Sequence, residues 1–210
     1  MSIQTFETHI RDSAPGFRCY AAGDKTKTPA FLAKVSHKLG SPAKSKSLAA
    51  NKQISAKAAE PFRELWQLHD GMCLYCDSKS DTKGIQFFGA ANWQSETETM
   101  RSEMSAMGFD EAAMPEWFAN CTVFGQIPHS ANYFAVGTEG LGSGQIYYLD
   151  HDDYREDPIA SSLDALLDMI AADPAKFIHE RGCYTRYSDG KTNKQWIPQE
   201  YIPDYNKSTS

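Results

Sequence analysis

The most reactive-looking stretch of the chain places several carboxylates around one histidine. It contains Asp150, His151, Asp152, Asp153 and Glu156. Metallohydrolases hold a divalent cation with oxygen and imidazole ligands of this kind at the end of a strand. A metal-dependent hydrolase using Asp150, His151 and Asp152 is therefore one hypothesis. Such a site needs a further ligand from elsewhere, and His129 or His69 is the candidate.

The favoured interpretation of this stretch is a polar turn that joins a strand to a helix. Asp157 is a good N-cap residue and Pro158 suits the first helical position. We therefore expect no catalytic residue, no metal and no cofactor at the turn. The same acidic turn remains a candidate surface for binding another protein.

The cysteines offer a second possible chemistry, because Cys73 and Cys76 form a CxxC motif. Metal ribbons need a second pair, and Cys19, Cys121 and Cys183 are far apart in the sequence. The motif lies within MCLYCD, which predicts a strand, and residues three apart in a strand point to opposite faces. We therefore expect structural thiols. An odd number of cysteines without framework spacing fits reduced thiols in the cytoplasm.

A glycine-rich stretch, TEGLGSG, resembles a phosphate-binding loop, but it leads into the predicted strand GQIYYLD. Phosphate loops lead from a strand into a helix, whose N-terminus binds the anion. We therefore expect a hairpin loop. No Gly-x-Ser-x-Gly or His-Glu-x-x-His motif is present in the sequence, and no local spacing marks a catalytic triad. The sequence favours a protein that is not an enzyme.

Charge is distributed unevenly along the 210 residues, whose net charge is -6. Residues 1–57 carry 10 basic and 3 acidic side chains, giving +7, and the rest carries 11 basic and 24 acidic ones, giving -13. An acidic body repels nucleic acid and attracts basic partners. We expect it to bind a basic protein partner and no nucleic acid. No apolar run approaches the ~20 residues that cross a bilayer, and no secretory signal is expected.

The hydrophobic pattern predicts three regions. Residues 1–57 are expected to form a basic N-terminal extension, partly helical, with one helix over 30–40. Residues 58–182 are expected to form the domain, with helices over 60–71 and 94–107, strands around 72–77, 85–90, 121–127, 132–137 and 144–151, and helices after Asp157 and Asp173. Residues 183–210 are rich in Tyr, Trp and Ile, and we expect this tail to pack on the domain. The order predicts an α+β fold with a central, mainly antiparallel sheet flanked by helices.

Four segments of the predicted domain form a pattern together: the helix-to-strand junction ELWQLHDGMCLY, the aromatic strand SANYFAVG with its glycine loop, GQIYYLDHDD, and the helix PIASSLDALLDMI. In this order they resemble the SUKH superfamily, the Smi/Knr-like proteins. Together they cover about residues 58 to 180. The basic N-terminal segment and the tail after Gly182 lie outside the resemblance.

The resemblance implies a domain that acts by binding, with no catalytic residues assigned. Bacterial members commonly neutralise a toxin as immunity proteins, and yeast members are regulatory scaffolds. For a basic toxin such as a nuclease, an acidic surface around Asp150, Asp152, Asp153 and Glu156 could occupy its groove. Trp93 and Trp117 are candidate aromatic anchors, although a core position is favoured for each. A scaffold without a toxin partner stays an alternative, and the oligomeric state is left open.

Overall fold

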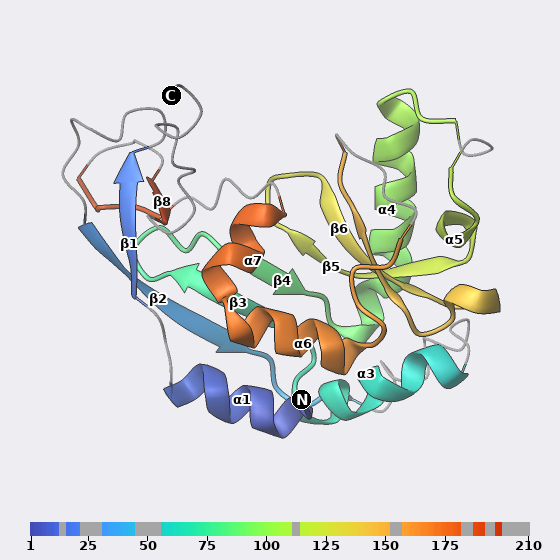
Figure 1. The fold of residues 1–210 in the computed structure, drawn as a ribbon, viewed down its shortest axis with the longest axis horizontal. Coiled ribbons are helices and arrows are strands. Elements are labelled where there is room, and N and C mark those ends of the chain that lie inside the picture. Colours follow the sequence, from blue (N-terminus) through green and yellow to red (C-terminus); the bar gives the residue numbers. More distant parts are fainter. Residues whose placement is uncertain are drawn as a thin grey trace, which may run out of the picture.

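The computed structural model is an α+β fold built on one eight-stranded sheet, shown in Figure 1. It describes residues 1–12, 16–21, 31–44, 56–110, 114–151, 157–181, 187–191 and 196–198. The strand order is β7-β6-β5-β4-β3-β2-β1-β8, and every pair of neighbours is antiparallel. This confirms the predicted class, a mainly antiparallel sheet flanked by helices.

The strands follow the apolar runs of the sequence. They are β1 (Gly16–Ala21), β2 (Phe31–Leu39), β3 (Met72–Asp77), β4 (Ile85–Phe87), β5 (Cys121–Ile127), β6 (Asn132–Gly137), β7 (Ile146–Leu149) and β8 (Trp196–Pro198). All described positions of β6 and β7 are buried, because both faces of that part of the sheet are covered. Strand β2 is buried at Ala33 alone, so much of its surface is open.

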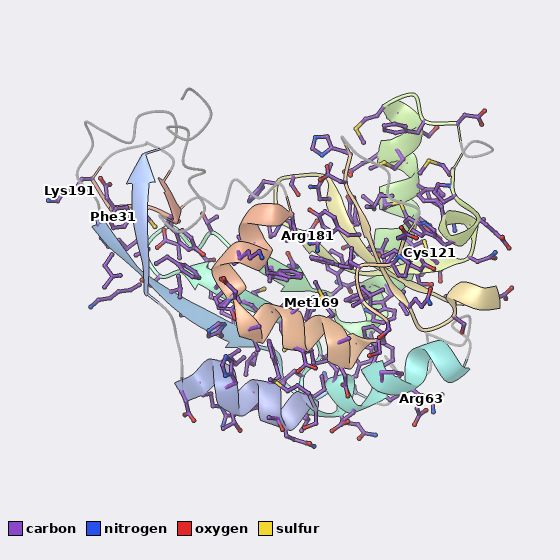
Figure 2. All side chains as sticks on the ribbon, in the orientation of Figure 1. Phe31, Arg63, Cys121, Met169, Arg181 and Lys191 are labelled. Atoms are coloured by element: carbon purple, nitrogen blue, oxygen red, sulfur yellow. The ribbon has the colours of Figure 1, made fainter. Side chains whose placement is uncertain are left out.

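The helices cover the sheet on two sides. They are α1 (Ile3–Asp12), α3 (Ala56–Leu68), α4 (Trp93–Ala106), α5 (Glu116–Ala119), α6 (Leu163–Ala172) and α7 (Pro174–Glu180). In Figure 1, α6 and α7 cross in front of the central strands, α1 and α3 run below them, and α4 and α5 lie at the right. Figure 2 shows side chains filling the space between these helices and the sheet. Among the described helices, none has the length and apolarity needed to cross a bilayer.

Ring contacts identify which helices cover which face. On β6 and β7, Phe134 and Tyr147 belong to neighbouring cross-strand rows and therefore point to opposite faces. Phe134 stacks on Phe177 of α7 with ring centroids 5.9 Å apart, and Tyr147 stacks on Trp117 of α5 at 4.3 Å. Helices α6 and α7 therefore cover one face, and α4 and α5 cover the other.

The prediction of a helix over residues 30–40 is wrong, because the segment forms strand β2. Helical spacing placed Leu32 on the buried stripe, whereas its side chain is 62% exposed. Pairing with β1 on one side and β3 on the other supplies the hydrogen bonds that fix the strand, and tertiary pairing overrides local helix propensity. The hydrogen-bonded sheet therefore continues across the boundary expected at residue 57.

Two predicted helix starts also need correction. Helix α3 begins at Ala56 rather than near Pro61, which lies inside it. Helix α6 begins at Leu163, and its N-cap is Ser162, whose side chain accepts a hydrogen bond from the Ala165 amide. Before this cap, Ala160 forms an antiparallel bridge with Ile146 of β7. Because this segment pairs with a strand, the helix begins later in the sequence than predicted. The start predicted at Asp173 is confirmed by α7, where the Asp173 carboxylate accepts from the Lys176 amide at 3.0 Å.

Candidate functional site

The predicted acidic turn is described only in part. Asp150 and His151 directly follow β7 and are both partly exposed, with Asp150 Oδ1 3.8 Å from His151 Nδ1. Asp152, Asp153 and Glu156 lie outside the described residues. Within the described part of the chain, no three His, Cys, Asp or Glu side chains are placed to hold a metal ion.

The two histidines considered as extra ligands have other environments. His69 Nδ1 contacts the Gly40 carbonyl oxygen at 2.9 Å, and its Nε2 lies 3.2 Å from the Glu7 carboxylate on α1. It thereby links α1 to the end of α3. His129 is exposed in the turn between β5 and β6, where its φ of 67° is in the left-handed region. Neither histidine is part of a described metal cluster with His151.

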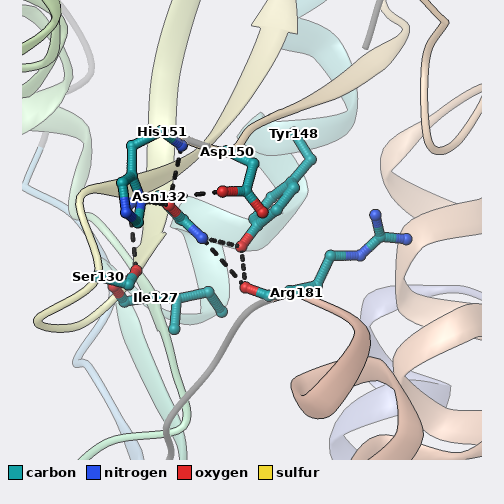
Figure 3. Close-up of polar contacts among 7 residues, drawn as sticks. All are labelled: Ile127, Ser130, Asn132, Tyr148, Asp150, His151 and Arg181. Carbon is teal, nitrogen blue, oxygen red and sulfur yellow. Dashed lines mark hydrogen bonds and ion pairs between the residues drawn. The ribbon is translucent and has the colours of Figure 1, made fainter. Parts of the chain in front are cut away.

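A buried hydrogen-bond network holds the turn in place, as Figure 3 shows. Its centre is Asn132, which is 1% exposed. The Asn132 amide nitrogen donates to the Tyr148 hydroxyl at 2.8 Å and to the Arg181 carbonyl at 3.2 Å. The Asn132 amide oxygen accepts from the His151 backbone at 3.2 Å and contacts His151 Nδ1 at 2.7 Å. The Asn132 side chain therefore joins β6, β7 and the end of α7. It also fixes the position of His151, which gives this histidine a structural role.

Trp93 and Trp117 occupy core positions. Trp93 is 1% exposed, packs against Phe62 and Trp66 at centroid distances of 4.9 and 4.7 Å, and donates from its indole to the Phe88 carbonyl. Trp117 is 9% exposed and stacks on Tyr147. An interface anchor must present its ring to the partner. The structure therefore corrects the candidate partner-binding role of both tryptophans, since their rings are used inside the domain.

Helix α4 carries carboxylates that the sequence analysis did not select. Glu96 and Glu103 are two helical turns apart and both act electrostatically on Tyr133 of β6, whose hydroxyl donates to the Glu103 carboxylate. Partial burial, followed by the charge of Glu103, raises the pKa of Glu96 above its usual range. Burial also raises the pKa of Tyr133, so this hydroxyl stays protonated and donating.

No described ion pair neutralises the α4 carboxylates. Glu98 is exposed and accepts a hydrogen bond from the Gln94 side chain at 3.0 Å. The one cation of α4 is Arg101, and its guanidinium donates to the Ala119 carbonyl at 3.1 Å, at the end of α5. Because Tyr133 pairs with Leu149, the α4 carboxylates and Asp150 lie at the same end of β6 and β7. Glu96 and Glu103 are seven residues apart and share one side of α4, whereas Glu98, two residues after Glu96, points to another side. We call Glu96, Glu103 and Asp150 the acidic face.

The CxxC motif has a different geometry from the predicted one. Along β2 and β3, Lys38 pairs with Cys73 and Ser36 pairs with Cys76, so three steps on β3 correspond to two steps on β2. This is a β-bulge, and Tyr75 within it has a φ of 56°. A bulge shifts the alternation of side chains by one residue. Cys73 and Cys76 therefore point to the same face, and the prediction of opposite faces is wrong.

The bulge also carries backbone strain. A left-handed conformation is uncommon for a bulky non-glycine residue and costs on the order of 1–3 kcal/mol. The surroundings hold Tyr75 in place, because its backbone amide donates to His37 at 3.3 Å and its carbonyl accepts from the Tyr187 hydroxyl at 3.3 Å. Its ring is 1% exposed and packs edge-on against His37 at 4.8 Å. The fold thus maintains a strained turn that places two thiols side by side.

The two thiols differ in their electrostatics. The Cys76 thiol donates to the Cys73 carbonyl at 3.5 Å, and each thiol acts on the pKa of the other. The hydrogen bond from Cys76, helped by Lys83 and Lys38 and opposed by burial, lowers the pKa of Cys73 to about 7. The same hydrogen bond and burial raise the pKa of Cys76. Cys73 is therefore the thiolate of the pair, and the partner keeps its proton.

Cys73 lines an open pocket of about 300 Å³. The pocket lies where the ends of β2, β3 and β4 meet the segment before α4, and its polar lining includes Lys38, Asp70, Gln86 and Asn92. In the lining, the backbone of Gly89 lies close to the Asp70 carboxylate, and a Cβ on Gly89 would lie 2.8 Å from Asp70 Oδ1. Cys73 is partly exposed, whereas Cys76 is fully buried. This volume is at the lower end of the range for small-molecule sites.

The glycine-rich loop has the predicted role. It connects the antiparallel strands β6 and β7, and the Gly137 amide donates to the Gln145 carbonyl at 3.0 Å across its base. The loop leads into a strand and not into a helix, so it has no helix N-terminus to bind a phosphate.

Comparison with known proteins gives no family for this chain, since no family model matches it and no curated protein matches its sequence. Two features of the molecule itself bear on its function, the acidic face and the Cys73–Cys76 pair.

Proposed function

We propose that this protein is a non-enzymatic binding domain of the immunity type, related to the SUKH superfamily, that neutralises a basic toxin domain in the cytoplasm by occluding it. The acidic face carries this proposal. Its α4 carboxylates have no cationic partner among the described residues, and burial together with the like charge of Glu103 raises the pKa of Glu96. A partner that supplies Lys or Arg side chains relieves that repulsion on binding.

Asp150 extends this surface from α4 to the end of β7. Asp150 lies at the same end of the sheet as α4, and Asp152, Asp153 and Glu156 follow it directly in the sequence. Residues 58–210 carry a net charge of -13, which favours electrostatic steering toward a basic surface and disfavours nucleic acid. The four described cysteines form no disulfide, which fits a reducing compartment.

The contacts of His151 are consistent with a protein that binds a partner and does not catalyse a reaction. Its Nδ1 contacts the Asn132 amide oxygen, so this nitrogen serves the turn. The hydrolase hypothesis requires Asp150, His151 and Asp152 to act on a metal. Elemental analysis of the purified protein, together with hydrolase assays of His151→Ala, tests that hypothesis directly. Stoichiometric metal and an activity lost in His151→Ala would contradict the binding proposal.

Titration calorimetry with the toxin domain encoded beside this gene tests the proposal. We expect a tight 1:1 complex whose affinity falls as salt is raised, because steering between opposite charges is screened. Absence of binding, or of an adjacent toxin gene, would contradict the immunity role and favour a regulatory scaffold.

A charge-matched pair of variants locates the surface. The triple variant Glu96→Gln, Glu98→Gln, Glu103→Gln removes the α4 charges, and we expect the affinity to fall about tenfold or more. The control, with Glu60→Gln and Glu64→Gln on α3 and Asp164→Asn on α6, removes the same charge from exposed positions elsewhere. Equal weakening by both variants would mean that only the net charge matters and that α4 is not the contact surface.

A further inference from the structure

We propose that Cys73 and Cys76 form a redox-active dithiol that exchanges with low-molecular-weight disulfides entering the pocket beside Cys73. This activity is separate from the proposed binding function and does not depend on it. Three observations carry it: the bulge that places both thiols on one face, the hydrogen bond from the Cys76 thiol to the Cys73 carbonyl, and the pocket that opens beside the more exposed of the two.

The geometry of the pair is built by the sheet. Cys73 faces Lys38 and Cys76 faces Ser36 across β2, and Lys38 and Ser36 are two residues apart on one strand. Residues two apart in a regular strand share a face, so the two thiols do as well. A bulge re-aims side chains and is frequent beside functional sites. The strained backbone of Tyr75 is the observation that marks this bulge as maintained by the fold.

Differences in exposure and in nearby charge give the two thiols different roles. Cys73 is partly exposed and borders the pocket, so an incoming disulfide reaches this sulfur first. Lys38 and Lys83 act on it as cations, which favours the thiolate that attacks. Cys76 is fully buried behind it, within hydrogen-bonding contact. Cys73 is therefore the attacking thiol and Cys76 the resolving one.

The exchange balances in two steps. The Cys73 thiolate attacks one sulfur of a disulfide RSSR, forms the mixed disulfide with RS, and releases the other half as a thiolate that takes a proton from water. The Cys76 thiol then loses its proton to water and attacks the Cys73 sulfur, which forms the Cys73–Cys76 disulfide and releases the second half as a thiolate, which takes a proton from water to give the second RSH. In total, the two protein thiols are oxidised, and one RSSR is reduced to two RSH.

The expected rate advantage of Cys73 is modest, so the pair matters more than the single thiol. With a pKa of about 7, half of Cys73 is thiolate at neutral pH, whereas an ordinary thiol is roughly 3% thiolate. Lower basicity reduces intrinsic nucleophilicity, which leaves roughly a threefold gain in rate. A fast second step from a thiol already in contact is what commits the exchange to the protein disulfide.

Peptide mapping in glutathione redox buffers tests the proposal. Cys73 and Cys76 lie in one tryptic peptide, residues 64–79, which excludes the other cysteines. With oxidised glutathione in excess, we expect this peptide to lose two hydrogen atoms in mass and to resist alkylation. In Cys76→Ser, the same peptide should retain one glutathionyl group on Cys73. In Cys73→Ser, Cys76 should stay reduced and alkylate only after unfolding.

The control variant is Cys121→Ser, because Cys121 is buried, outside the peptide, and donates its thiol to the Phe118 carbonyl at 3.2 Å. It should still form the disulfide in peptide 64–79. If the cysteine variants do not fold, alkylation of the native wild type decides: iodoacetamide should modify Cys73 before Cys76. A peptide that stays reduced in oxidised glutathione alone, or equal glutathionylation of Cys73 and Cys76 in the two serine variants, would overturn the proposal.

Discussion

One face of the sheet carries two regions that differ in how they are covered. Over β5 to β7, helices α4 and α5 cover this face, and carboxylates of α4 form a surface outside it. Over β2 to β4 the same face is open, and the cross-strand row Lys38, Cys73, Gln86 is exposed or partly exposed. The covered half presents negative charge, whereas the open half presents a thiol and a cation.

The boundary between the halves lies at β4 and β5, where Gln86 and Gln126 pair and their side chains hydrogen-bond at 3.1 Å. Beyond this pair, Tyr133 is next to Gln126 in the row and is buried beneath Glu103. Helix α4 thus decides which polar groups reach solvent. The presence of helices over β5 to β7 and their absence, among the described residues, over β2 to β4 therefore separate the acidic face from the Cys73–Cys76 pair.

The largest expected effect is a loss of stability in the aromatic core beside the covered half of the sheet. Trp93→Ala removes a fully buried ring from the cluster formed with Phe62, Trp66 and Phe124, and we expect it to lower the free energy of unfolding by about 3–5 kcal/mol. Urea denaturation measures this loss, and Trp93→Phe should recover part of it. A Trp93→Ala protein of unchanged stability that loses its partner would instead restore Trp93 as an anchor.

Next in size is the network beneath the acidic turn. Asn132→Ala leaves the Tyr148 hydroxyl and the His151 amide without their partner, so we expect a loss of about 2–3 kcal/mol in unfolding free energy. Ser130→Ala is the comparison in the same turn, because it removes the part-buried hydroxyl that donates to the Ile127 carbonyl and accepts from the Asn132 backbone amide, and it should cost about 1 kcal/mol. Equal losses from both variants would show that Asn132 is not the centre of the network.

The open half responds to the loss of a cation. Lys38→Gln removes one of the charges that lower the pKa of Cys73, so the pKa should rise and alkylation of the native protein at pH 7 should slow about twofold. Lys34→Gln is the control, because Lys34 is exposed on the same strand but is not among the charges that act on Cys73. Mass spectrometry of peptide 64–79 during iodoacetamide treatment follows the rate, and an unchanged rate in Lys38→Gln would contradict the assigned electrostatics.

The smallest effect concerns Glu96. Its pKa is raised in the folded protein, so the folded state binds the proton more tightly than the unfolded chain does. Wild-type stability should therefore fall as the pH rises from the unfolded pKa of about 4.3 through the higher folded pKa. Glu96→Gln lacks this loss, and its stability relative to wild type should grow over that window and then stay level. Urea midpoints from pH 4 to pH 7 test it, and a constant difference would contradict the shifted pKa.

Local pattern was enough to predict most elements of the central domain. The apolar runs at 121–127 and 132–137 form adjacent antiparallel strands, and the helix predicted over 94–107 forms as α4, which buries Met100 and Met104. Strand β2 was missed because its pattern fits a helix equally well, and only pairing with β3, far along the chain, selects the strand.

The sites were harder to predict for the same reason. Asp150 and His151 were selected from their residue types, but Asn132, which holds them, is 19 residues from His151 in sequence. The SETET sequence shows that α4 is acidic, but it does not show which side chains gather. The contact of Tyr133 with Glu103 places the carboxylates beside β6, and Arg101 does not neutralise them because it donates to the Ala119 carbonyl of α5. Cys73 and Cys76 were interpreted by regular strand alternation, and the bulge at Tyr75 has no local sequence signal, since it places a tyrosine where glycine or asparagine is usual.

Carboxyl footprinting of the toxin complex is the most direct test of the binding account. Labelling of exposed carboxylates, with and without the toxin domain encoded beside the gene, is measured peptide by peptide. We expect labelling of Glu96 and Glu103 to fall on binding, while labelling of Glu60 and Glu64 on α3 is unchanged. Unchanged labelling along α4, with protection appearing on α3 instead, would contradict it.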